Sequence, residues 1–369
     1  MVFKDLEFFK IFIYFFCIYK FMLFMNKNIL ITGSSGFLGE ELVNYFSKEN
    51  NIFALDKDAP IKFDGNLKNI STINCDIRDK EKLENFFKNN EVNIIIHCAA
   101  EILDEKNPNE VWKTNYNGTK NLLDLSEIYN VSKFIFTSTF SIFEKNYDSP
   151  IDEKEPSSAI VDYGKSKYAA ENLILSHTYK GDVVIFRCPV VIGKKRLDKL
   201  ALLFEMVRQK TNIWLIGDGS NKIHFIYSLD LINAINLSLN LVGKNLFNVG
   251  SNNVKSIYEV FYRLLIHAKS NKKIKKFPKK LGLILLKFFN IINLVSLGPY
   301  HQRMLVSNCV LNTDRIKSKI NWSPNYTNEQ MLIECYDYYL STLKKEKENS
   351  SSKKLPKLTI IRLLKIFNL

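Results

Sequence analysis

Tyr163 and Lys167 stand four residues apart in the stretch "SAIVDYGKSKYAAENL", where a polar loop gives way to helix-like sequence. In a helix, positions i and i+4 share a face. A free tyrosine has a pKa of about 10, and a nearby ammonium group favours the phenolate. The pair therefore predicts an acid/base that exchanges a proton with an alcohol or ketone while hydride moves to or from a cofactor. An ordinary helix-surface pair is the alternative, because this spacing also arises by chance.

A glycine-rich stretch, "TGSSGFLGEEL", follows a short apolar run and precedes a helix-like segment. Glycines allow tight turns and close approach of a pyrophosphate, and the helix N-terminus supplies free N–H groups. This context predicts a dinucleotide-binding loop. Its candidate contacts are Gly33, Ser35, Gly36, Phe37, Leu38 and Gly39.

Acidic residues at the ends of the next two predicted strands indicate which dinucleotide binds. Asp56 ends the second strand, where a carboxylate accepts hydrogen bonds from ribose hydroxyls and repels a 2′-phosphate. This favours NAD, and NADP remains open because Lys57 is adjacent. Asp76 and Ile77, after the third strand, are candidates to flank the adenine. Asp79 is predicted to cap a helix.

Apolar runs alternate with helix-patterned segments along the first half of the chain. The predicted strands are 28–33, 51–56, 70–76, 92–100, 133–139 and 182–189. The predicted helices are 37–48, 80–89, 109–130 and 166–178. This alternation predicts an α/β fold with a Rossmann-like, doubly wound parallel sheet.

The domain organisation follows from where this alternation begins and weakens. Residues 25–189 are predicted to form the NAD-binding domain, and residues 190–343 a smaller substrate-binding lobe interleaved with the sheet. Residues 1–24 form an aromatic-rich extension whose uncharged run is too short to span a membrane. We favour translation from Met25; an interfacial anchor is the alternative. Residues 344–369 are predicted to be a basic tail that begins as a polar linker.

Composition narrows the class of protein and its partners. The chain of 369 residues is 46% hydrophobic, which suits a packed core. Its net charge is +14, and the whole excess lies in residues 251–369, which favours anionic partners or simply a solvated lysine-rich surface. The 6 cysteines show no metal or disulfide spacing, so we expect no metal, and Cys75 and Cys98 as buried hydrophobes in a reducing compartment. No nucleic-acid-binding module is apparent.

Taken in order, several short motifs resemble the extended short-chain dehydrogenases/reductases, the family of NAD-dependent epimerases and dehydratases. They include "TGSSGFLG", "HCAA", "NYNGTKNLL", "FIFTST", "YGKSK", "FRCPVVIG" and "INWSPNY", over about 300 residues. The resemblance implies that Tyr163 is the catalytic acid/base and that Lys167 binds nicotinamide ribose and lowers the tyrosine pKa. It implies that Thr139 binds the reacting oxygen, with Ser138 as the alternative register. It also implies cofactor contacts at Ala99, Ala100, Asn115 and Pro189.

Two departures from the family pattern bear on the substrate. Dehydratases carry an acidic pair after the Ser/Thr, whereas Phe140 and Ser141 follow Thr139, so dehydration is not expected. Many sugar-nucleotide epimerases hold the diphosphate with an arginine in the "GDG" segment, where this chain has Ile223 and His224. His224 is expected to be buried or solvated and not a ligand.

Two basic amphipathic segments remain. Residues 281–297 have polar residues every third position, which predicts a lid helix over the substrate pocket, with a membrane-facing helix as the alternative. For residues 354–369 the preference is reversed, and peripheral attachment to an acidic membrane is expected.

These features favour an NAD(P)-dependent oxidoreductase or epimerase acting on a small molecule, a secondary alcohol or ketone of a nucleotide-activated sugar. The first alternative resembles the 3β-hydroxysteroid-dehydrogenase-like branch and takes a lipid or isoprenoid alcohol. A non-catalytic dinucleotide sensor is the third, although the Tyr, Lys and Thr of the site are all present. The resemblance implies a homodimer. The expected location is the cytoplasm, with the inner face of the membrane as a variant.

Overall fold

The computed structural model describes residues 26–58, 63, 68–102, 107–196, 200–291 and 305–348. The predicted extension of residues 1–24 and the amphipathic segment 354–369 lie outside these residues. The polar linker expected from Lys344 is helical as far as Glu348, where helix α13 (Asn328–Glu348) ends. In the described part of the chain, every helix is too short or too polar to cross a bilayer.

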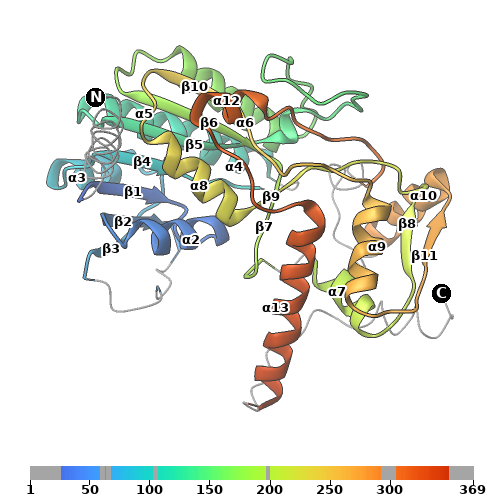
Figure 1. Ribbon diagram of the computed structural model, residues 1–369. Coiled ribbons are helices and arrows are strands. Elements are labelled where there is room, and N and C mark those ends of the chain that lie inside the picture. The colour runs from blue at the N-terminus through green and yellow to red at the C-terminus, as the bar shows by residue number, and fades with distance from the viewer. Residues whose placement is uncertain are drawn as a thin grey trace, which may run out of the picture. The chain divides into compact units, whose positions relative to one another are not determined.

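Seven strands form the main sheet in the order β10-β6-β5-β4-β1-β2-β3 (Figure 1). They are β1 (Asn28–Thr32), β2 (Asn51–Asp56), β3 (Ile70–Asn74), β4 (Ile94–His97), β5 (Lys133–Thr139), β6 (Asp182–Cys188) and β10 (Lys244–Asn248). Pairing is parallel from β3 through β2, β1 and β4 to β5. The Rossmann-like α/β prediction is confirmed: all six predicted strands are present, and β10 is a seventh that the sequence analysis missed.

The register of the parallel strands aligns their carboxyl ends. Thr32, the last residue of β1, pairs with Leu55 of β2 and with His97 at the end of β4. Strand β4 is buried throughout and β1 almost throughout, as expected of parallel strands covered on both faces. The loops that follow β1, β2 and β4 therefore emerge at one edge, which is where open α/β sheets bind ligands.

The helices between these strands lie close to their predicted positions. Helix α2 (Phe37–Phe46) follows the glycine loop, and α3 (Lys80–Asn89) begins after Asp79, whose side chain accepts from the amide of Lys82 at 3.1 Å, so the predicted cap is confirmed. The helix expected over 109–130 consists of α4 (Pro108–Trp112), a π-helical stretch η1 (Lys113–Gly118) and α5 (Thr119–Ile128). Helix α6 (Asp162–Ser176) begins before the predicted residue 166 and so contains both Tyr163 and Lys167.

The chain forms two compact units. The first comprises the described residues of Met1–Thr137, with Ala169–Ile185 and Ser238–Asn245; the second comprises those of Ser138–Tyr168, Phe186–Leu237 and Leu246–Leu369. The remaining elements are the 3-10 turn η2 (Phe140–Ile142), β7 (Val190–Ile192), α7 (Ala201–Arg208), β8 (Ile213–Ile216), β9 (Phe225–Tyr227), α8 (Ser228–Ser238), α9 (Ile257–His267), β11 (Ile274–Phe277), α10 (Lys279–Ile291) and α12 (Asp314–Ile320).

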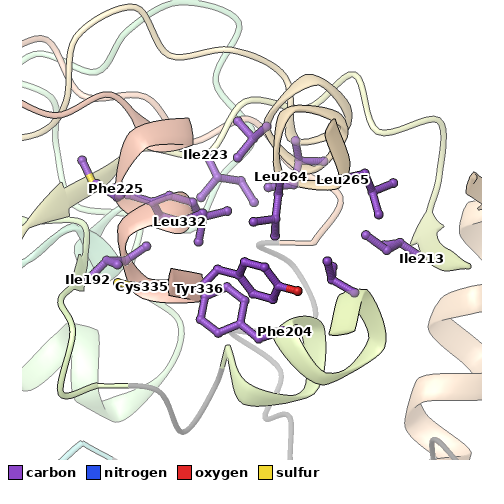
Figure 2. Packing of buried hydrophobic residues seen from close by; sticks show 14 of the residues in the cluster. Ile192, Phe204, Ile213, Ile223, Phe225, Leu264, Leu265, Leu332, Cys335 and Tyr336 are labelled. Atoms are coloured by element: carbon purple, nitrogen blue, oxygen red, sulfur yellow. The ribbon is translucent and has the colours of Figure 1, made fainter. Parts of the chain in front are cut away.

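An apolar core holds the second unit together. Figure 2 shows Phe204 of α7 close to Tyr336 of α13, with Leu264 of α9 nearby. The rings of Phe204 and Tyr336 meet edge to face with centroids 5.7 Å apart. Ile223 and Phe225 extend the same core, so the segment after "GDG" is anchored by burial.

Candidate active site

The glycine loop has a conformation that only glycine satisfies at two positions. Gly33 has φ +71°, and a Cβ there would lie 2.7 Å from the amide nitrogen of Ala99. A Cβ on Gly39 would overlap the carbonyl oxygen of Gly33 and approach Cα of Ser34 to 2.7 Å. The loop therefore packs tightly both on the end of β4 and on the first turn of α2, which leaves its outer backbone open to a ligand.

Ser35 and Asp56 provide polar atoms at this loop that fit a dinucleotide. The amide of Ser35 donates to Oδ2 of Asp56 at 2.9 Å, and the amide of Asp58 donates to Oδ1 at 3.1 Å. The Oγ atom of Ser35 is buried and has no hydrogen-bond partner among the residues that the structure describes. A buried hydroxyl without a partner is costly unless a ligand satisfies it. Together with the glycine cradle and the first-turn amides of α2, these atoms match the needs of a bound pyrophosphate and ribose.

Asn115 fixes the segment that follows β4. Its side chain is buried; Oδ1 accepts from the amide of Glu101 at 2.8 Å, and Nδ2 donates to the carbonyl of Glu101 at 3.0 Å. Ala99 and Ala100 lie directly before this clamp, so Asn115 positions the backbone of two predicted cofactor contacts. The clamp comes from η1, and π-helical stretches often mark functional sites. Glu101 also forms an ion pair with Lys57 at 3.1 Å.

His97 lies beneath these contacts, and the sequence analysis did not single it out. Its Nδ1 lies 2.6 Å from Oγ1 of Thr32, and its Nε2 lies 2.9 Å from Oγ1 of Thr119. Thr119 donates to the carbonyl of Asn115 at 2.6 Å, so its oxygen accepts from Nε2–H. The His97 ring thus links β1 and β4 to the Asn115 clamp. A polar residue ending the buried run "NIIIH" was the available signal.

Asp76 and Ile77, the two residues after β3 that were predicted to flank the adenine, both contact other residues of the protein. Asp76 is held by Arg78, whose Nε and Nη2 atoms bind the carboxylate at 3.0 and 2.6 Å, and this pairing lowers the pKa of Asp76. Ile77 is buried, and its side chain would meet any Cβ placed on Gly118. Cys75 is buried as expected, but Cys98 is only partly buried because it follows the last residue of β4.

Tyr163 and Thr139 meet in the second unit. A hydrogen bond joins the two side chains and acts to lower the pKa of Tyr163, while burial outweighs it and raises that pKa. Thr139 Oγ1 also accepts from the amide of Ser141 at 3.1 Å and lies 3.0 Å from Ser141 Oγ. The turn η2 therefore fixes the threonine hydroxyl. The structure shows this contact with Tyr163 for Thr139.

Lys167 lies one turn beyond Tyr163 on α6, with only 1% of its surface exposed. Pro189 is the single residue between β6 and β7 and is buried. Arg196 was not among the predicted site residues, yet its positive charge acts on Tyr163 in the direction that lowers the tyrosine pKa. A basic residue in the loop after β7 carried no motif, so only the fold reveals it.

After "GDG", the two residues that depart from the family pattern, Ile223 and His224, are both engaged within the protein. Ile223 is buried in the apolar core. His224 accepts from the amide of Leu311 at 3.1 Å through Nδ1, and its Nε2 donates to the carbonyl of Ser251 at 2.7 Å. Burial lowers the pKa of His224 to about 4, so the ring is neutral. His224 is therefore a buried structural residue, as expected. In the part of the chain that the structure describes, no cluster of His, Cys, Asp and Glu could hold a metal ion.

The chain is similar in sequence and in fold to several known proteins. The model of the "NAD dependent epimerase/dehydratase family" matches residues 29–250. An uncharacterized protein of Sinorhizobium fredii, y4nG, is 26% identical over 85% of this chain and 78% of its own length. A putative UDP-glucose 4-epimerase of Methanocaldococcus jannaschii is 29% identical over 63% of this chain and 80% of its own. The structure of dTDP-glucose 4,6-dehydratase from Bacillus anthracis with NAD superposes with a TM-score of 0.68 at 26% identity, covering 86% of this chain and 98% of that one.

Proposed function

Because this chain belongs to the NAD dependent epimerase/dehydratase family, we propose that it transfers hydride at a secondary alcohol or ketone of a nucleotide-activated sugar. The hydrogen bond between Tyr163 and Thr139 carries the proposal, since it joins a proton donor and an oxygen-binding hydroxyl. A relative whose name specifies a UDP-sugar epimerase supports the substrate class. The cofactor of this family is NAD, and the glycine loop of the first unit fits it.

Gly33, Gly36 and Gly39 would hold the pyrophosphate of NAD, with Ser35 Oγ as a hydrogen-bond donor and Asp56 on the ribose. When bound, NAD accepts a hydride from a carbon that bears a hydroxyl and returns one to a carbonyl carbon. Asn115 and His97 hold the neighbouring backbone at Ala99 in place.

The residues proposed to transfer the proton belong to the second unit. The Tyr163 phenolate takes the proton of the substrate alcohol as its C–H hydride leaves, and the Tyr163 hydroxyl gives a proton back when the carbonyl is reduced. Thr139 Oγ1 orients the substrate oxygen toward Tyr163. Buried Lys167, one turn along α6, favours the phenolate form of Tyr163 through its positive charge. Because Phe140 and Ser141 supply no carboxylate, the site suits epimerisation or simple oxidation and reduction better than dehydration.

Many sugar-nucleotide epimerases bind the diphosphate with an arginine at the place where this chain has Ile223. Arg196 would supply that positive charge instead. A diphosphate needs a positive partner, and the charge of Arg196 already acts on Tyr163. Replacing it by alanine should raise the KM for a sugar nucleotide roughly 10- to 100-fold, the range of hydrogen bonds to charged groups, and should also lower kcat, because the charge that lowers the pKa of Tyr163 is lost. Arg263→Ala, on the exposed face of α9, is the matched control. Equal KM values for the two variants would remove Arg196 from this role.

A lipid or isoprenoid alcohol is the second candidate substrate. Two observations favour it: Ile223 occupies the place of the diphosphate arginine, and α10 exposes aliphatic side chains. In such an enzyme the cofactor would exchange after each turnover.

The deciding experiment offers the NAD-loaded protein a panel of UDP- and dTDP-sugars and a polyprenyl alcohol. Products are followed by NMR, and reduced cofactor by absorbance at 340 nm. An epimeric sugar without net NADH supports an epimerase, and accumulating NADH supports a dehydrogenase. Turnover of the polyprenyl alcohol alone supports the second candidate. Turnover that persists unchanged in Tyr163→Phe contradicts the proposed mechanism.

A further inference from the structure

Helix α10 presents an exposed aliphatic face. Leu281, Ile284 and Leu285 are 57%, 64% and 41% exposed, and their spacing of three and four residues places them on one side of the helix. The other side packs on β8, because Gly282 is buried and a Cβ there would lie 2.8 Å from the side chain of Ile216. The exposed face is therefore not the face that attaches α10 to its own unit.

Lysines are frequent in the segment that contains the start of this helix. Lys279 and Lys280 are exposed in the first turn of α10, where positive charge opposes the helix dipole and does not stabilise the helix. The Nζ of Lys279 donates to the carbonyl of Val306 at 3.1 Å, whereas Lys280 shares a helix face with Ile284. On β11, Lys275 lies 4.9 Å above the ring of Trp214. Further exposed lysines of the segment are Lys272, Lys273 and Lys276. Between Glu259 and Asp314 the sequence contains no acidic residue, and the carboxylate that the structure shows acting with a lysine of this segment is Asp218, with Lys276.

Trp214 adds an amphipathic ring next to these lysines. It lies on β8, meets Phe277 of β11 edge to face at 6.2 Å, and its buried Nε1 has no hydrogen-bond partner in the described structure. Because this N–H is buried, it does not reach headgroups or water, and the ring serves the apolar contact between β8 and β11.

We propose that Leu281, Ile284 and Leu285, together with the exposed Lys272, Lys273 and Lys280, form a docking surface for an anionic lipid bilayer; we call it the α10 surface. The aliphatic side chains enter the acyl boundary, and the lysines reach the headgroup phosphates with their stems along the apolar region. An acidic protein would match the lysines alone, whereas the bare Leu and Ile side chains favour lipid. This role is independent of which substrate the site takes.

Vesicle sedimentation of the full-length protein tests the surface. It should bind vesicles of phosphatidylcholine with phosphatidylglycerol, and bind weakly to phosphatidylcholine alone. Lys273→Gln with Lys280→Gln should weaken partitioning about 30-fold, the effect of two lysines at an anionic surface. Leu281→Ser with Ile284→Ser should weaken it at least tenfold, as roughly expected for lost aliphatic burial. Val242→Ser, at an 82% exposed position in the first unit, is the control and should bind as the native protein does.

A depth measurement locates the contact. In Ile284→Trp, lipids brominated on their acyl chains should quench fluorescence beyond the quenching seen in the native protein. Val242→Trp should show no such increment. Vesicle binding without quenching at position 284 would mean that another segment, such as residues 354–369, makes the contact, and would overturn the proposal. Absence of binding to anionic vesicles, including the case where an acidic protein binds instead, would overturn it as well.

Discussion

The amide of Ser35 donates a hydrogen bond of 2.9 Å to Oδ2 of Asp56, which ties the glycine loop to the end of β2. The bond holds the carboxylate of Asp56 at the loop and orients it, and the proposed ribose contact would use the same carboxylate. The relationship explains why the turn residue Ser35 and the strand residue Asp56 belong to one site although neither motif alone requires it.

Replacing Asp56 by asparagine should change which dinucleotide binds. The amide oxygen can still accept from Ser35, but the charge that repels a 2′-phosphate is lost. NAD should bind roughly 10-fold more weakly and the preference for NAD over NADP should shrink, as measured by titration calorimetry with both nucleotides. Asp58→Asn, at an exposed neighbour, should keep the native preference. An unchanged preference in Asp56→Asn would contradict this role.

Because the buried Ser35 hydroxyl lacks a hydrogen-bond partner in the described structure, its removal should weaken NAD binding without lowering thermal stability. Ser35→Ala removes no hydrogen bond that the described part of the chain contains, so Tm should stay within a degree or two of the native value while the Kd for NAD rises about 5- to 10-fold. Ser256→Ala is the reverse control. Ser256 caps α9 in a capping box, so its loss should cost about 1 kcal/mol of unfolding free energy and leave NAD binding unchanged. A Tm loss without a Kd change in Ser35→Ala would assign that hydroxyl to the fold.

Tyr163 and Thr139 should differ in how strongly they control the rate. Tyr163→Phe removes the proton donor and should lower kcat by about 10²- to 10⁴-fold, the usual contribution of general acid–base catalysis. Thr139→Val keeps the donor but loses the oxygen contact, so a smaller loss of about 10- to 100-fold is expected. Stopped-flow detection of reduced NAD in a single turnover separates the chemical step from product release. Ser138→Ala is the control for the alternative register and should be near native.

His224 predicts a pH dependence of stability. Its folded pKa is about 4, against 6.5 in the unfolded chain. Below about pH 6.5 the His224 ring is protonated in the unfolded chain but stays neutral in the folded protein. The free energy of unfolding should therefore fall as pH drops from 6.5 toward 4. The loss amounts to about 3 kcal/mol, from 1.36 kcal/mol per unit. Urea unfolding at several pH values measures it.

His224→Gln should have lower stability at pH 7 and a flatter slope between pH 6.5 and 4. His267→Gln, at the end of α9, should retain the slope that His224 causes. Parallel pH profiles for the native protein and His224→Gln would show that another group produces the acid sensitivity.

Sequence alone predicted the parts that local pattern determines. The apolar runs gave six strands, and the glycine spacing between a strand and a helix predicted the dinucleotide loop. Strand β10 was missed because "KNLFN" is short and interrupted by asparagines, and only pairing at the edge of the sheet makes it a strand. Helix α6 begins earlier than predicted because Gly164 obscures its apolar periodicity.

The positions of His97 and Arg196 could not be predicted from the sequence. His97 matters because Thr32 and Thr119, distant in sequence, lie on either side of its ring. Arg196 acts on Tyr163 only through the folding of the chain after β7. Both depend on long-range contacts, for which a single sequence carries no periodic signal.

The most direct test of the account is the nucleotide content of the purified protein, determined by acid release and followed by titration of the stripped protein with NAD. The account predicts that NAD is released, or that the stripped protein binds added NAD saturably, and that Gly39→Val abolishes this binding because its side chain would overlap the Gly33 carbonyl. Failure of the folded native protein to bind NAD would contradict the assignment of the glycine loop and the mechanism that depends on it.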